Sequence, residues 1–175
     1  MNLHPLFVHF PIALLSLYAL IECASYIFFR RNEKLVLIKG VLVILGAITA
    51  LPTILFGMYA ESMLGGEEII HEVTETHEAF AIITFLIFAL LATAYALRLS
   101  HGTAFKLFVI SKWLLFKKIY DIKYALALHM TDGWFAPVVA AIGLISLVIT
   151  GALGAAITRG PEADAIVSFV YHFLF

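Results

Sequence analysis

The sequence has few charges and almost no cysteine, and both shortages exclude familiar classes of protein. Only 13% of the 175 residues are charged, whereas 63% are hydrophobic, a balance far from that of a soluble globular domain. The single cysteine, Cys23, excludes disulfides, zinc ribbons and the C-x-x-C-H attachment of a c-type haem. The solvent around most of this chain must therefore be lipid.

An excess of positive charge is also missing, because the formal net charge is −1. A surface that binds nucleic acid needs clustered Lys and Arg, so we expect no nucleic-acid partner. No G-x-S-x-G, H-E-x-x-H or glycine-rich phosphate loop occurs. We therefore predict no catalytic residues and no enzyme activity for the chain alone, although a role as a redox subunit stays open.

What the chain does contain is a set of long apolar runs without period-two alternation. A helix needs about 20 such residues to cross a bilayer, and a lipid-exposed backbone must satisfy its own hydrogen bonds, which favours helices over a barrel. The sequence predicts an all-α fold, a four-helix transmembrane bundle that forms a single domain over residues 1–160. Four runs qualify as spans, at residues 6–29, 36–60, 78–97 and 134–157, and a C-terminal tail follows over 161–175.

The distribution of basic residues predicts the orientation of these spans. Ten of the eleven Lys and Arg residues lie between the first and second spans, at the start of the second span, or between the third and fourth spans, and only Arg159 falls on the opposite side. By the positive-inside rule the basic side is cytoplasmic, so the amino terminus and the tail face outward. We expect a multi-pass protein of the inner cell membrane, with the lipid bilayer as its partner.

Several residues near and within the spans allow more local predictions. From Phe105 to Tyr120 apolar residues recur at helical spacing with lysines between them, which predicts an amphipathic helix along the inner leaflet between the third and fourth spans. Glu22 and Lys39 lie inside spans, where an isolated charge is costly. A pair between them is the simplest account, and a proton relay or a buried protonated Glu22 are the alternatives. Small residues in the last span predict the close approach of another helix, and they are Gly143, Gly151 and Gly154.

Five of the seven histidines belong to the outer side, and their depths suggest two tiers. His9 and His77 occupy the first turns of inward-running helices and form an inner pair. His4 and His71 precede them by about 7.5 and 9 Å if the segments are helical and form an outer pair. Offsets of five and six residues do not share a helical face, so any site must be built between helices, as is usual in bundles. The fifth, His172, lies in the tail.

Imidazole is the usual ligand of haem iron and also binds copper and zinc. The leading hypothesis is a b-type haem held near the outer face by His9 and His77, with His4 and His71 as second-tier ligands or hydrogen-bonding partners. Such a protein would transfer electrons to a redox partner or within a larger respiratory complex. Three alternatives stay open: a copper or zinc ion held by the same four histidines with nearby carboxylates, a structural or assembly subunit, and histidines that only cap helices and pack.

The opening segment His4-Pro5-Leu6-Phe7-Val8-His9-Phe10-Pro11 resembles the start of an uncharacterised family of small prokaryotic membrane proteins, domain of unknown function 2231. A second helix that ends near Gly57, a third that opens at His77, and the run Thr150-Gly151-Ala152-Leu153-Gly154 are similar in outline. The segment 155–160 and the tail depart from the family pattern. The resemblance implies a four-helix membrane fold and singles out His4, His9 and His77, without implying what they bind.

Overall fold

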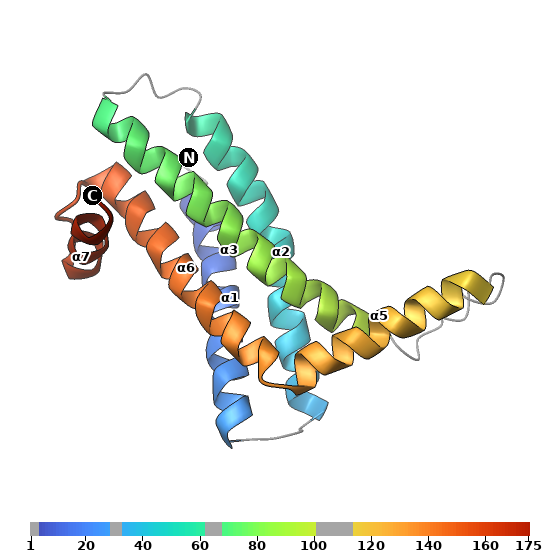
Figure 1. Ribbon diagram of the computed structural model, residues 1–175. Coiled ribbons are helices and arrows are strands. Elements are labelled where there is room, and N and C mark those ends of the chain that lie inside the picture. Colours follow the sequence, from blue (N-terminus) through green and yellow to red (C-terminus); the bar gives the residue numbers. More distant parts are fainter. Residues whose placement is uncertain (1–3, 29–32, 62–67, 101–113) are drawn as a thin grey trace.

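The fold is known from a computed structural model, which describes residues 4–28, 33–61, 68–100 and 114–175 (Figure 1). Within these ranges every regular element is a helix and no strand occurs, which confirms the all-α prediction. The helices are α1 (His4–Phe28), α2 (Glu33–Glu61), α3 (Glu68–Ser100), α5 (Leu114–Asp132), α6 (Phe135–Arg159) and α7 (Ala165–Leu174).

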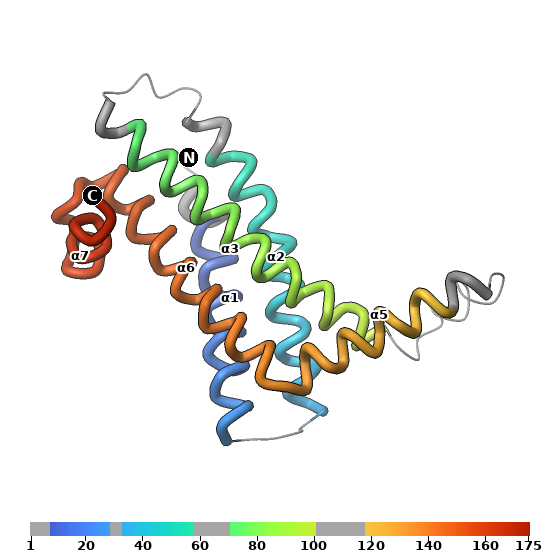
Figure 2. Tube along the Cα trace, viewed as in Figure 1, coloured from blue at the N-terminus to red at the C-terminus, as the bar shows by residue number. Residues whose placement is uncertain are grey.

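Four of these helices are long and apolar enough to cross a membrane, as the sequence predicts. The qualifying segments are Val8–Phe28, Glu33–Gly57, His71–Ser100 and Phe135–Arg159, from α1, α2, α3 and α6. In the bundle α2 packs against α1 and α3, and α6 also packs against α1 and α3 (Figures 1 and 2). Helices α1 and α3 therefore face each other across its centre.

The third helix begins much earlier than the sequence predicts. It starts at Glu68 rather than at residue 78, so most of the expected connection from 61 to 77 is helical. Hydropathy locates the part of a helix that crosses hydrocarbon, whereas the helix itself continues through polar residues such as Glu72 and Glu75, which are compatible with helix. His71 and His77 consequently lie on one continuous helix.

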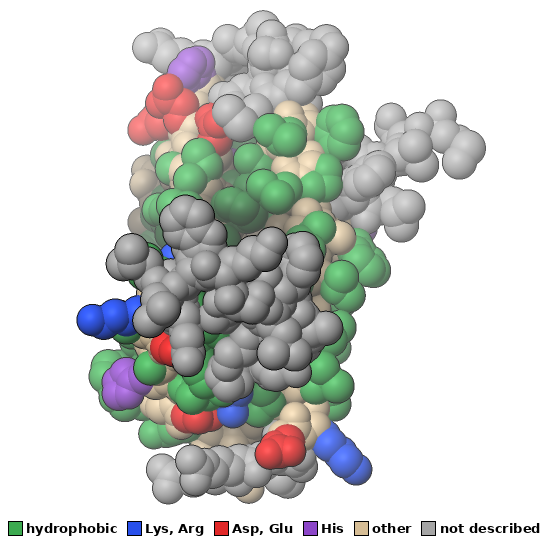
Figure 3. All heavy atoms as spheres, turned by 90° about the vertical axis from the view of Figure 1, so that its right-hand side faces the viewer, with side chains coloured by type: hydrophobic (Ala, Val, Ile, Leu, Met, Phe, Trp, Pro, Cys, Tyr) green, Lys and Arg blue, Asp and Glu red, His purple; other side chains and the backbone are tan. Residues whose placement is uncertain are grey.

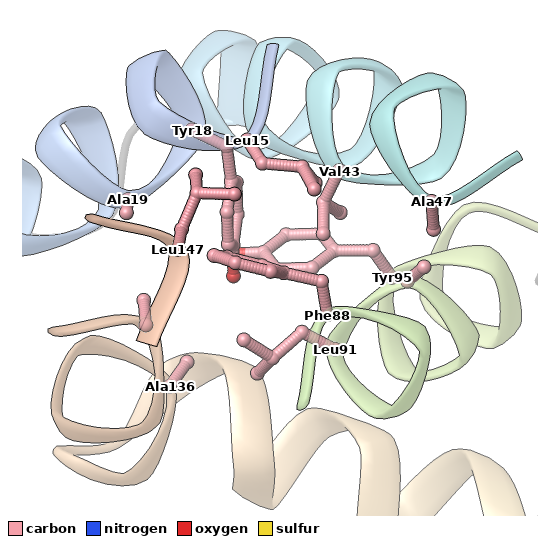
Figure 4. Packing of buried hydrophobic residues seen from close by; sticks show 12 residues of the cluster. Leu15, Tyr18, Ala19, Val43, Ala47, Phe88, Leu91, Tyr95, Ala136 and Leu147 are labelled. Atoms are coloured by element: carbon pink, nitrogen blue, oxygen red, sulfur yellow. The ribbon is translucent and has the colours of Figure 1, made fainter. Parts of the chain in front are cut away.

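The middle of the bundle is filled by aromatic and branched side chains. Tyr18 of α1 makes edge-to-face contacts with Phe88 and Tyr95 of α3, with ring centroids 6.2 and 5.9 Å apart. Figure 4 shows these rings meeting between the helices, with Leu15 and Leu147 beside them. Edge-to-face pairs suit the ring quadrupole, so this layer fixes the distance between the diagonal helices.

The connection between α3 and α6 contains α5, which leaves the bundle at an angle (Figure 2). Arg98 near the end of α3 donates to Thr131 (2.7 Å) and Asp132 at the end of α5. The expected amphipathic segment 105–120 overlaps the helix only at residues 114–120, and residues 105–113 lie outside the described part. Exposed lysines, Lys118 and Lys123, alternate on α5 with exposed apolar residues, which are Ile119, Ile122 and Leu126.

Charged side chains lie mainly toward the two ends of the molecule. On the face in Figure 3 hydrophobic side chains are seen around the middle, acidic side chains and histidines appear toward both ends, and Lys and Arg appear in the lower part. Many spanning-helix residues on the outside are large and apolar, such as Leu20, Leu86 and Ile145. Such a surface suits lipid rather than water.

Candidate functional site

His77 lies on the face of α3 that points into the bundle. It precedes Thr84 by seven residues, Phe88 by eleven and Tyr95 by eighteen, which are all spacings that return to one helical face, and its side chain is half-buried. Its Nδ1 lies 3.0 Å from the carbonyl oxygen of Thr150 on α6. Because a carbonyl oxygen can only accept, Nδ1 carries the proton, and Nε2 of the neutral ring keeps a lone pair.

Glycines of α6 make room for α3 at two points. A Cβ on Gly154 would lie 3.1 Å from Cε1 of His77, and one on Gly143 would lie 2.9 Å from Cγ2 of Ile87 and from Cζ of Phe88. The predicted close approach is therefore confirmed at these two glycines. At Gly151 the prediction is wrong, because among the described residues no atom lies within 4 Å of the corresponding point.

Hydroxyl groups continue the polar contacts of His77 toward the middle of the bundle. Thr84 Oγ1 lies 2.7 Å from Ser146 Oγ and 3.3 Å from Thr150 Oγ1, and Thr150 also donates to the Ser146 carbonyl at 2.8 Å. We call His77, Thr84, Ser146 and Thr150 the α3–α6 polar seam. Sequence inspection missed its hydroxyl residues, although the seven-residue spacing of His77 and Thr84 placed both on one helical face.

His9 occupies a different face of its helix from the core residues. Its side chain is exposed, and the buried residues Pro11, Leu15 and Tyr18 are rotated by about 180° to 240° from it around α1. His9 therefore faces away from the bundle interior, and the structure does not bring it to His77. Position 4, in contrast, precedes Pro11 by seven residues and Tyr18 by fourteen, so its backbone is in helical register with those buried residues; its side chain is outside the described ones.

The other predicted ligands are separate from His77 as well. His71 is exposed, and its Nδ1 lies 3.5 Å from the Glu75 carboxylate one turn later. The tail histidine, His172 of α7, to which the sequence assigns no ligand role, pairs with Glu162, Nε2 to Oε1 at 2.9 Å. Among the side chains that the structure describes, no group of three or more His, Cys, Asp or Glu is placed to hold a metal ion.

A second polar cluster lies near the opposite end of the bundle, around Glu22. This side chain is 2% exposed and Lys39 is 7% exposed, and Lys39 Nζ donates to Glu22 Oε1 at 2.9 Å, which confirms the predicted pair. Tyr95 donates to the other carboxylate oxygen, and Lys39 also donates to Ser25 at 3.1 Å. Because these groups come from α1, α2 and α3, the cluster holds three helices together.

The hydroxyl of Tyr18 lies within the core next to this cluster. It is fully buried and is without a hydrogen-bond partner among the described residues. The sequence predicted the pair of Glu22 and Lys39 from the cost of charge in lipid, but it gave no signal for the tyrosines, since aromatic residues are abundant in every span. Because Glu22, Lys39 and Tyr95 are buried, we assign the cluster to the stability of the bundle.

Four apolar helices of membrane-spanning length, packed around buried polar contacts, define a multi-pass helical membrane protein. A family model, Predicted membrane protein (DUF2231), matches residues 1–116, and the chain belongs to this family. The match includes α1, α2 and α3, whereas α6 and α7 follow it. No curated protein and no solved structure matches the chain.

Proposed function

We propose that this protein carries a b-type haem near the end of the bundle where α1 begins, and that it transfers electrons within the membrane. The observation that carries the proposal is the state of His77. Its ring is inside the bundle, Nδ1 is fixed by the Thr150 carbonyl, and no hydrogen bond to Nε2 occurs within the described part of the chain.

This arrangement is the one that a ligating histidine needs. Histidines that bind metals almost always donate their other ring N–H to a carboxylate, a carbonyl or water, which fixes both the tautomer and the ring orientation. The absence of a side chain at Gly154 lets the His77 ring pack closely against α6. Haem iron, when bound through Nε2, would supply one-electron chemistry, and the fixed tautomer of His77 supports that role.

The second histidine that would hold the haem in this proposal belongs to the amino-terminal turns of α1. His9 was the first choice from depth alone, but its side chain faces away from the core. Position 4 is in helical register with the buried residues of α1, which makes His4 the better partner for His77. His9 and His71 then serve as surface residues near the cofactor rather than as its ligands.

The proposal includes an orientation and a location. The basic residues of α5 and of the 30–39 region lie at one end of the spans, and the histidine end is acidic. By the positive-inside rule the histidine end is outside an inner cell membrane. Electrons would then pass between the haem and a redox partner, or a larger respiratory complex, at that surface.

The test is an absorption spectrum of the detergent-purified protein, oxidised and then reduced with dithionite, with elemental analysis of the same sample. A reduced α-band with iron supports the proposal. His77→Ala and His4→Ala should each abolish or shift the band, whereas His9→Ala and the control His129→Ala, on exposed α5, should leave it unchanged.

Other outcomes would assign the histidines differently. Copper or zinc without haem, reduced by the same two substitutions, would favour the metal-handling alternative. A featureless spectrum without metal, from cells supplied with haem, would overturn the proposal and leave a structural or assembly role. Loss of the band in His9→Ala but not in His4→Ala would show that the assignment of the second ligand is wrong.

A further inference from the structure

The short helix α7, Ala165–Leu174, presents three different faces. Its start is capped by Asp164, whose carboxylate accepts from the backbone N–H groups of Ile166 and Val167, both at 3.0 Å. One face is buried on α6 through Val167 and Val170. The sequence suggested only a tail here, because the segment is too short to span a membrane.

The second face is apolar and uncovered. Ile166, Phe169 and Phe173 are 61%, 71% and 77% exposed, and the two phenylalanine rings stack with centroids 6.2 Å apart. At about 100° per residue these three positions span only about 60° of the helix circumference. A continuous apolar patch of this kind on a docked helix is not expected to face water.

The third face is polar and points in another direction. His172 and Ala165 lie on it, and His172 bonds to Glu162 in the turn before the helix. This face is rotated by about 90° from the centre of the apolar one. A helix with one side on protein, one side apolar and one side polar has the pattern of a helix at a boundary between lipid and water.

The depth of α7 agrees with such a boundary. Its buried residues belong to one cluster with Ala152, Leu153 and Ala156 of α6, and the α6 span ends at Arg159. These contacts therefore lie about 5 to 10 Å inside the end of the span, at 1.5 Å per residue, where interfacial helices insert. In Figure 1 α7 is seen nearly end-on beside α6, so the two helices cross steeply.

We propose that α7 is an interfacial helix whose Ile166, Phe169 and Phe173 insert among the acyl chains of the leaflet at the carboxyl end of α6. The ligand is the apolar part of the lipid and not a charged headgroup, because Ala165–Leu174 contains no Lys or Arg. The α6 span that α7 packs against also exposes large apolar residues, Ile145 and Val148. The inference rests on the membrane class of the protein and is independent of the proposed haem.

The test uses spin labels on single cysteines in the full chain with Cys23→Ser, which removes the only native thiol. Labels are placed by Phe169→Cys and Phe173→Cys, with Ala165→Cys as the control on the polar face of the same helix. Ile145→Cys, in the exposed middle of α6, reports a position in lipid. Each protein is reconstituted at low density in phosphatidylcholine vesicles, and collisions with oxygen and with a water-soluble nickel complex are measured.

The oxygen-to-nickel collision ratio at positions 169 and 173 should exceed the ratio at 165 and approach that at 145. Replacing part of the phosphatidylcholine by anionic lipid should not change it. A ratio at 169 and 173 equal to that at 165 would overturn the proposal, because α7 would then lie in water. Shielding of 169 and 173 from both reagents would also overturn it, since a second protein copy or another protein would cover the face.

Discussion

The clearest quantitative prediction concerns the buried pair of Glu22 and Lys39. Lys39→Met removes the ammonium but keeps most of the side-chain volume, and it leaves the Glu22 carboxylate with Tyr95 as its remaining donor. Removing one partner of a buried ion pair costs about 3 to 5 kcal/mol. We expect a loss of this size in the free energy of unfolding, because both groups are almost fully buried.

A double-mutant cycle tests the pair further by also removing the charge of Glu22. Glu22→Gln keeps an oxygen that accepts from Tyr95, so the double variant Glu22→Gln with Lys39→Met contains no unpaired charge. Replacing a whole buried pair is often neutral or even stabilising. The double variant should therefore be more stable than Lys39→Met alone, with a coupling energy of about 2 to 3 kcal/mol.

The assay is unfolding of the detergent-solubilised protein by increasing mole fractions of sodium dodecyl sulphate, followed by the loss of helical circular dichroism. Lys118→Met, at an exposed position of α5, serves as the control and should change stability by less than about 0.5 kcal/mol. The reasoning is refuted if Lys39→Met costs less than about 1 kcal/mol, or if the losses of the two single variants simply add.

Three further predictions concern α6, α7 and the segment between them. Gly143→Ala should destabilise the protein by about 1 to 3 kcal/mol in the same unfolding assay, because its Cβ would meet Ile87 and Phe88 at 2.9 Å; Gly151→Ala, in open space, should be neutral or stabilising. Gly154→Leu should displace the His77 ring and weaken or shift any haem band, and an unchanged band would contradict the proposed ligand. The hydrogen bonds from His172 and Ser168 lower the pKa of Glu162 below its ordinary value of 4.5. Their contribution to the free energy of unfolding is therefore complete above pH 4.5, and it is lost as the pH falls through the pKa of the folded state. His172→Ala should raise that pKa, which a carbon NMR titration of the carboxyl group would detect.

Much of the fold followed from the sequence because lipid imposes simple requirements. The apolar runs located α1, α2 and α6 within a few residues, and the cost of a charge in hydrocarbon predicted the pair of Glu22 and Lys39. The start of α3 was missed because polar helical turns outside the hydrocarbon resemble a loop in hydropathy. The helical character of α7 was missed because its ten residues are too few to be recognised as a span.

The candidate site was harder to predict, because depth in the membrane is not the same as direction around a helix. Hydropathy predicts that His9 and His77 both open spans at similar depths, yet only His77 lies on a core face. The seven-residue register of position 4 with Pro11 and Tyr18 would have placed it on the core side of α1. A single sequence does not show, however, that Pro11 and Tyr18 are the buried residues. The partner of His77, a backbone carbonyl at Thr150, leaves no trace in the residue pattern.

The four spanning helices pack in the order α1, α2, α3, α6 around the bundle, and α6 closes this arrangement by packing on both α1 and α3. Helix α6 is synthesised after the other three spans, yet it contributes Ser146 and Thr150 to the polar seam and separates α1 from α3 on one side. Until it inserts, His77 and Thr84 would lack the hydrogen-bonding partners on α6 that the structure describes, Thr150 and Ser146. The last span therefore completes the bundle during biogenesis, and a nascent chain that stops after α3 should be a substrate for membrane quality control.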